Sequence, residues 1–247
     1  MRPFGRSIKA ELDLALEARN TEFAAHNMGR FPDLVIPEAF GKFTRKRLLV
    51  VSFFSGVSAV DWIRGEHGEK LNGEHVAALG ADAILHMVFI DGFFHADPHP
   101  GNVLFLPEGR IGLLDFGMMG RLSISRREQF ALLLGAIIER DEDGLVDTLL
   151  EWSDGGETNV DLLGQECSAF LGNYTSRELK DLDVAAMLLD IMAIVRENNL
   201  VQPADIAGLI KVFLALEGLG NALDPSFSLD AHLEPIARRM MRQLRSP

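Results

Sequence analysis

The stretch from residue 94 to residue 117 constrains the fold of this chain more than any other. Asp97 and Asn102 stand five residues apart in a loop-like segment, and Asp115 opens an Asp-Phe-Gly triplet. Between them lie two short β-rich segments, residues 103–106 and 110–114, joined by a Pro-Glu-Gly turn that is typical of a hairpin. Because a hairpin folds the loop back against the triplet, we expect these three oxygen-bearing side chains to converge.

The converging residue types suit a divalent cation and a phosphate group. Mg²⁺ prefers hard oxygen ligands, which Asn102 and Asp115 supply, and Asp97 adds a carboxylate that can handle the proton of a nucleophile. The spacing matches the catalytic loop of protein kinases. His95, Asp97 and His99 could instead be read as a zinc or iron triad, although no further histidine or cysteine cluster completes it. We expect His95 to be structural, with hydrogen bonds to the loop or to the triplet backbone.

The remaining sequence predicts an α+β fold in which a small mixed portion precedes a large helical one. Helical periodicity covers residues 8–28, with Leu16 and Phe23 on its apolar stripe, and residues 73–91. Residues 34–36 read as a short strand, and the nearly continuous apolar run 47–54 predicts a buried strand. Only helices are expected afterwards: 125–139, 142–152, 160–173, 181–198, 203–220 and 231–244.

Charge and composition exclude several classes of protein. The 247 residues include 24 Lys and Arg but 36 Asp and Glu, which gives a net charge of −12 and argues against nucleic acid as a partner. One cysteine, Cys167, excludes an internal disulfide and a cysteine-rich zinc site. No run reaches the roughly 18 apolar residues of a membrane-spanning helix. We therefore expect a cytoplasmic protein, with peripheral membrane contact left open.

The motifs together resemble the UbiB/AarF family of atypical protein-kinase-like proteins. The resemblance rests on H-A-D-P-H-P-G-N at residues 95–102, L-L-D-F-G at 113–117, E-L-D at 11–13 and E-A-R-N at 17–20. It implies a kinase-like fold with a partial nucleotide lobe at residues 1–56 and a helical lobe at residues 57–247. It also implies ATP and Mg²⁺ as cofactors and a link to isoprenoid-quinone (ubiquinone) biosynthesis, with ATPase activity more expected than protein phosphorylation.

The resemblance also assigns roles to individual residues. Asp97 corresponds to the catalytic-loop aspartate, Asn102 and Asp115 to the magnesium ligands, and Glu17 to the helix glutamate that pairs with a strand lysine. Glu11 and Asp13 correspond to an acidic pair that meets a lysine of a K-x-G-Q segment. The adenine of the nucleotide would contact the hinge backbone at Ser52, Phe53 and Phe54. The γ-phosphate would lie near His99.

The expected partner of Glu17 is missing from this sequence. The lysine that precedes it, Lys9, lies on the same predicted helix and about 12 Å away along the axis, so it cannot take the strand lysine's place. We therefore expect a truncated chain that binds ATP weakly. Three readings follow: a phosphotransferase or ATPase of this family, a non-catalytic pseudokinase scaffold that binds a lipid or partner, and, less favoured by the motifs, a kinase of the aminoglycoside-phosphotransferase type.

Two features of the helical part leave a lipid partner open as an alternative. The last predicted helix places Arg238, Arg239, Arg242 and Arg245 opposite an apolar side, so it could lie on anionic lipid or simply pack on the helical lobe with its basic face solvated. Apolar stripes between residues 125 and 220 predict core packing, and a cleft for an isoprenoid lipid or quinone precursor is the alternative.

Overall fold

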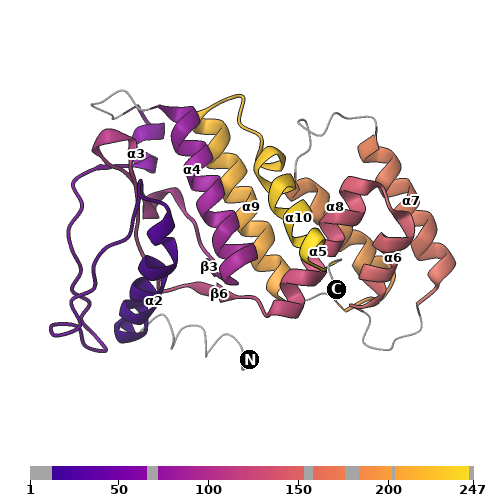
Figure 1. Ribbon diagram of the computed structural model, residues 1–247, viewed down its shortest axis with the longest axis horizontal. Coiled ribbons are helices and arrows are strands. Elements are labelled where there is room, and N and C mark those ends of the chain that lie inside the picture. The colour runs from indigo at the N-terminus through magenta and orange to yellow at the C-terminus, as the bar shows by residue number, and fades with distance from the viewer. Residues whose placement is uncertain (1–12, 66–71, 153–157, 176–183, 202–203, 245–247) are drawn as a thin grey trace. The chain divides into compact units, whose positions relative to one another are not determined.

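The computed structural model describes residues 13–65, 72–152, 158–175, 184–201 and 204–244 (Figure 1). The chain folds into two compact units, each of which packs mainly against itself. Unit 1 comprises residues 1–121 and 218–227, and unit 2 comprises residues 122–217 and 228–247. The mixed α+β class predicted from the sequence is confirmed. The lobe boundary expected at residue 56 stays a prediction.

Helix α2 (Leu14–Asn27) begins at Asp13, whose side chain accepts a hydrogen bond from the Ala15 amide at 3.2 Å. An aspartate at this position satisfies one of the free N–H groups that every helix start exposes. The buried face of α2 is not the predicted apolar stripe. Phe23 is 44% exposed, whereas the buried positions include the polar residues Asn20 and Thr21. The part of the predicted helix before residue 13 lies outside the described residues.

The predicted hairpin forms the centre of a four-stranded sheet in unit 1. Strand β4 (Val103–Phe105) pairs antiparallel with β5 (Ile111–Leu113), and the sheet order is β1-β5-β4-β2. Strand β1 (Leu34–Val35) runs parallel to β5, and β2 (Val57–Ser58) runs antiparallel to β4. The turn after β4 has positive φ angles at Glu108 (65°) and Gly109 (74°), which glycine tolerates well. The expected strand at 34–36 and the hairpin are thus present.

A second strand pair lies beside the hairpin and was not predicted. Strand β3 (Phe93–His95) pairs antiparallel with β6 (Met119–Arg121), so that His95 lies opposite Met119 (Figure 1). The β3 strand follows helix α4 (Gly73–His86), a π-helical turn (Met87–Asp91) and Gly92, whose φ of 61° breaks the helix. A side chain at Gly120 would overlap the Phe94 ring, which occupies the space where a Cβ would stand.

The predicted buried strand at residues 47–54 is wrong. These residues make isolated bridges, Ala39 with Val51 and Arg45 with Leu48, rather than a strand in a sheet. Leu48 and Val51 are exposed, and Phe53 is 91% exposed. The run 47–54 is apolar in composition, but among the described residues no neighbouring strand covers it.

Short helix α3 (Ala59–Ile63) follows this segment. It is capped by the Ser58 hydroxyl, which accepts from the Asp61 amide at 3.1 Å.

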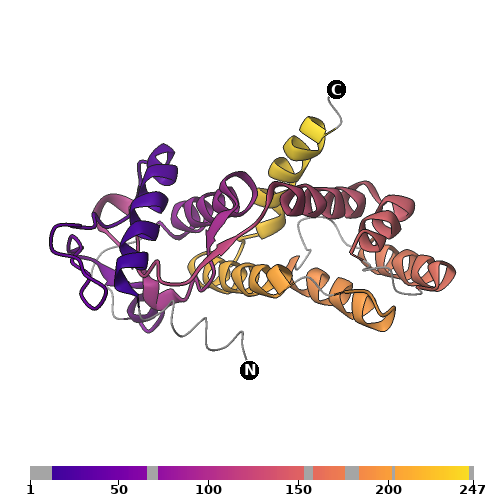
Figure 2. The ribbon, with the colours of Figure 1, turned by 90° about the horizontal axis from the view of Figure 1, so that it is seen from below.

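Unit 2 is built from helices, as the sequence predicts. They are α5 (Ile124–Glu139), α6 (Glu142–Leu150), α7 (Val160–Thr175), α8 (Val184–Glu197), the first part of α9 (Ala204–Leu223) and α10 (Leu229–Leu244). Helix α10, drawn in yellow, crosses α5 rather than running along it (Figure 2). Its apolar residues Leu233, Met240 and Met241 are buried, while Arg238 and Arg239 are exposed. The basic face therefore belongs to a helix whose apolar side is already packed.

By length and composition, one described helix could cross a membrane, the stretch Gly73–Asp91 that combines α4 and the π-helical turn. Half of this stretch is buried within the protein, and Val76, Leu85 and Phe89 contribute to the core of unit 1. Since a buried core helix has the same length and composition, this finding is weak evidence for a membrane span.

Candidate functional site

Backbone pairing brings the loop and the Asp-Phe-Gly triplet together in unit 1. The carbonyl oxygen of Asn102 accepts a hydrogen bond from the Leu114 amide at 2.8 Å, so Asn102 lies beside the residue that precedes Asp115. The Ala96 amide donates to the Met118 carbonyl oxygen at 3.0 Å, which joins the start of the loop to the residue after the triplet. The loop and the triplet are therefore held at two points by the β3–β6 and β4–β5 pairs.

His95 locks the loop onto the triplet. Its side chain is 2% exposed, Nε2 lies 3.2 Å from the Leu114 carbonyl oxygen, and Nδ1 accepts from the Asp97 amide at 3.2 Å. These partners require a proton on Nε2 and none on Nδ1. Burial lowers the pKa of His95, because desolvation outweighs the opposing effects of the Leu114 carbonyl and the carboxylates of Asp115 and Asp97. With both nitrogens engaged, His95 is not a metal ligand, and the structural role expected for it is seen.

Asp97 and His99 lie on the exposed side of the loop. In the described part of the chain no protein group hydrogen-bonds the Asp97 carboxylate. The backbone amide of Asp97 donates to His95 Nδ1. His99 Nδ1 accepts from the Gly101 amide at 3.0 Å and caps the 3-10 turn Pro100–Asn102. The imidazole therefore presents its Nε2 proton outward, and the carboxylate of Asp97 is open to a substrate.

Asp115 occupies a conformation that non-glycine residues adopt rarely. Its φ is 58°, and its Oδ1 accepts a hydrogen bond from the Gly117 amide at 3.1 Å. The following residue, Phe116, is buried, and its carbonyl oxygen accepts from Asn20 Nδ2 at 2.9 Å. The sequence motifs assigned Asn20 no role of its own. The signal that could have found it is a polar residue on the buried face of a helix.

Glu17 lies beside Asp115. A Cβ added at Gly117 would stand 3.1 Å from Asp115 Oδ1 and 3.6 Å from Glu17 Oε2, so both carboxylates border the same small space. Burial, and then the negative charge of Asp115, raise the pKa of Glu17. The structure thus places Glu17 next to the triplet. Of the predicted acidic pair, Asp13 caps α2, and Glu11 lies outside the described residues.

The expected hinge residues, Ser52 to Phe54, contact Glu38, solvent and β5 in turn. Ser52 exchanges hydrogen bonds with Glu38, its amide donating to the Glu38 carbonyl oxygen at 2.9 Å and its hydroxyl accepting from the Glu38 amide at 3.0 Å. Phe53 projects into solvent. The Phe54 ring lies over β5, 2.9 Å from where a Cβ on Gly112 would stand. Their role as a hinge for adenine stays a prediction.

The donor set fits a hard divalent cation. Asp115 has a second carboxylate oxygen, Asn102 a carboxamide oxygen and Asp97 a carboxylate, and among the described residues none of these is hydrogen-bonded by protein. The neighbouring Glu17 and Asp115 carboxylates repel each other, which a cation would relieve. In the part of the chain that the structure describes, no three His, Cys, Asp or Glu side chains are placed to hold a metal ion by themselves.

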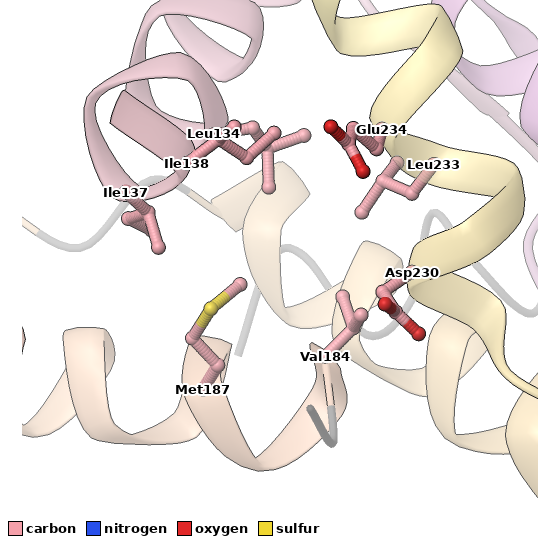
Figure 3. Close-up of a pocket in the computed structure, with 8 residues that line it drawn as sticks. All are labelled: Leu134, Ile137, Ile138, Val184, Met187, Asp230, Leu233 and Glu234. Atoms are coloured by element: carbon pink, nitrogen blue, oxygen red, sulfur yellow. The ribbon is translucent and has the colours of Figure 1, made fainter. Parts of the chain in front are cut away.

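A separate pocket lies within unit 2 between α5, α8 and α10 (Figure 3). Its volume is about 30 Å³, and its lining is apolar apart from the two carboxylates on α10; the lining residues are Leu134, Ile137, Ile138, Val184, Met187, Asp230, Leu233 and Glu234. The cleft for an isoprenoid lipid or quinone precursor that the sequence left open stays a prediction.

Comparison with known proteins identifies relatives of both units. A family model described as the ABC1 atypical kinase-like domain matches residues 1–149, and one described as the UbiB helical domain matches residues 167–228. Two uncharacterised proteins of Synechocystis sp. are similar: slr0889 is 30% identical over 88% of this chain and 56% of its own length, and sll0005 is 28% identical over 94% and 34%. The chain thus spans between a third and somewhat over half of these relatives.

A solved structure supports the fold. The Rv3197–erythromycin complex from Mycobacterium tuberculosis superposes with a TM-score of 0.61 at 18% identity, over 92% of this chain and 58% of that one. At this identity the likeness concerns the fold.

Proposed function

Because the chain belongs to the ABC1 atypical kinase-like family, we propose that it contributes the magnesium- and phosphate-handling part of an ATP-dependent phosphotransferase or ATPase. The observation that carries the proposal is the hydrogen bond between Leu114 and Asn102, which sets Asn102 and Asp115 on adjoining backbone segments. His95 holds the loop that carries Asp97, and the side chains of Asp97 and Asp115 are exposed. In this proposal they converge with Asn102 on one cation.

Each side chain has a distinct role in this proposal. Asn102 and Asp115 hold Mg²⁺, which when bound neutralises negative charge on the phosphates of ATP. Asp97 accepts the proton of the attacking hydroxyl or orients the attacking water. His99 offers its outward Nε2 proton to a phosphate oxygen. The activity is linked to isoprenoid-quinone biosynthesis, a proposal that the match of residues 167–228 to the UbiB helical domain supports.

A non-catalytic scaffold is the second candidate, and the position of Glu17 favours it. In kinases of known mechanism the corresponding glutamate pairs with a lysine that binds phosphates. Here Glu17 borders the Asp115 carboxylate, and burial with this like charge raises its pKa. A scaffold of this kind would bind a lipid or a partner protein and would need no cation at Asp115.

The two candidates differ in metal-dependent nucleotide binding. Mn²⁺ binding in the presence of a non-hydrolysable ATP analogue is measured by electron paramagnetic resonance for the wild-type chain and for Asp115→Asn. The substitution removes a charged ligand, so we expect affinity to fall tenfold or more, equivalent to about 1.4 kcal/mol or more. The matched control is Asp161→Asn, at an exposed position on α7 of unit 2, and should bind as the wild type does.

Equal affinity of the wild-type chain and Asp115→Asn would remove Asp115 from the metal site and with it the proposed function. An absence of nucleotide-dependent Mn²⁺ binding by the wild-type chain would favour the scaffold.

A further inference from the structure

We propose that Asn20 is a positioning residue whose buried carboxamide holds the Asp115–Gly117 turn in the conformation that presents the Asp115 carboxylate to the metal and nucleotide. The proposal deepens the proposed function and rests on it, because the orientation of Asp115 matters only where Asp115 is a ligand. It assigns a role to a residue on α2 that touches neither metal nor phosphate.

The placement of Asn20 is the first argument. It is 8% exposed, on a helix whose apolar Phe23 is 44% exposed. Burying a carboxamide is unfavourable unless its polar atoms find partners, so an asparagine at such a position requires a compensating bond. That bond is the 2.9 Å contact from Nδ2 to the Phe116 carbonyl oxygen, across 96 residues of sequence. An apolar side chain could fill the same space but would leave this carbonyl without its donor.

The backbone of the turn is the second argument. Asp115 has a φ of 58°, in the left-handed region that costs energy for a residue with a side chain. Three hydrogen bonds maintain it. His95 holds the Leu114 carbonyl oxygen before Asp115, the Gly117 amide holds Asp115 Oδ1, and Asn20 holds the Phe116 carbonyl oxygen after it. Of these three contacts, the one from Asn20 ties the turn to α2.

Loss of the Asn20 donor therefore has a specific expected consequence. The Phe116 peptide becomes free to rotate, and Asp115 can relax toward a negative φ. That relaxation separates Asp115 Oδ1 from the Gly117 amide and changes the direction of the Asp115 carboxylate. A role confined to stability would lower the free energy of unfolding without changing the turn of the folded protein.

Thr21 supplies a matched control for stability. It is the next residue on α2, it is also buried, and its hydroxyl donates to the Glu17 carbonyl oxygen at 2.8 Å within the helix. Thr21→Val removes a buried hydrogen bond on the same helix without removing a contact to the triplet.

The experiment compares the wild-type chain with Asn20→Ala, Asn20→Ser and Thr21→Val. The first readout is the NMR chemical shift and hydrogen-exchange rate of the Gly117 amide, which reports the bond to Asp115 Oδ1 without any ligand. The second is the dissociation constant of Mn²⁺ with a non-hydrolysable ATP analogue. Urea unfolding of each variant supplies the stability reference. Asn20→Ser, which replaces the carboxamide by a smaller hydroxyl group, serves if Asn20→Ala does not fold.

The proposal expects both Asn20 variants to lose the Gly117 signature, with exchange at least tenfold faster, and to bind Mn²⁺ and nucleotide at least tenfold more weakly. Thr21→Val should match the wild type in both readouts. An unchanged Gly117 amide in the Asn20 variants, or equal losses in Thr21→Val at equal stability, would overturn it. If the wild-type chain binds no Mn²⁺ with nucleotide, the proposed function fails and metal positioning fails with it, whereas the Gly117 amide still shows whether Asn20 holds the turn.

Discussion

Acidification should destabilise unit 1 through His95. In the folded protein the ring is buried and neutral, with its pKa lowered chiefly by desolvation. In the unfolded chain the ring titrates near its ordinary pKa of 6.5. The unfolded state therefore binds more protons below that pH, and stability rises with pH in this range. The contribution of His95 is fully present above the unfolded pKa and is lost as the pH falls toward the folded one.

The size of the effect follows from one proton. Protonating the folded ring would put a hydrogen on Nδ1, which faces the Asp97 amide at 3.2 Å and now accepts from it. If the folded ring stays neutral, lowering the pH from about 7.5 to about 5.5 stabilises the unfolded state by about 1.4 kcal/mol. The negative charges of Asp115 and Asp97 reduce this value, because both oppose the lowering of the His95 pKa.

Tryptophan fluorescence can isolate this unit. The chain has two tryptophans, Trp62 in unit 1 and Trp152 in unit 2, so Trp152→Phe leaves a reporter of unit 1 alone. Urea unfolding is measured at both pH values in this background with and without His95→Gln. The other six histidines and the carboxylates are the same in both proteins. The difference between the two pH dependences therefore belongs to His95.

We expect the protein with His95 to lose up to about 1.4 kcal/mol more than His95→Gln over this interval. The glutamine variant should be less stable at pH 7.5, because its amide cannot reproduce both ring hydrogen bonds. Equal pH dependences would show that His95 has an ordinary pKa in the folded chain. That result would refute the assignment of the ring as the neutral connection between the loop and the triplet.

Two further predictions concern unit 2. Burial raises the pKa of the Cys167 thiol to about 12, so Ellman's reagent at pH 8 should leave native Cys167 unlabelled and react once urea unfolds the unit; labelling of the native chain at the rate of a free thiol would contradict its burial. A Cβ on Gly135 would overlap the Sδ atom of Met241. Gly135→Ala should therefore be destabilising by about 1–2 kcal/mol, since overpacking exceeds the gain in helix propensity. In a double-mutant cycle with Met241→Ala, measured by urea unfolding, the combined loss should be smaller than the sum, and additivity would contradict the contact.

Local sequence patterns predicted the elements that depend on local interactions. The hairpin of β4 and β5 follows from two β-rich segments around a Pro-Glu-Gly turn, and the helices of unit 2 follow from apolar periodicity. The pair of β3 and β6 was not predicted because each strand has three residues, and Phe93–His95 follows an apolar helix after one residue, Gly92. Such short strands are identified by their partners rather than by their own composition.

The error at residues 47–54 has the same origin. An apolar run predicts burial, but burial also requires a covering element, and no strand of the described chain pairs with this segment beyond isolated bridges. Composition shows which residues favour burial. It does not show whether the residues that would cover them are present.

The residues of the candidate site likewise fall into those that a local motif identifies and those that only tertiary structure brings to the site. The motif predicted the types and spacing of Asp97, Asn102 and Asp115 because the chemistry fixes them. The groups that support them come from tertiary structure: Asn20 reaches the triplet across 96 residues, and Glu17 borders Asp115. Asparagine is unfavourable in the middle of a helix, so its presence on the buried face of α2 already indicates a partner outside that helix. Apolar periodicity does not identify such residues. Sequence analysis of a chain of this kind should therefore examine polar residues on the buried face of a helix as candidates for positioning a site.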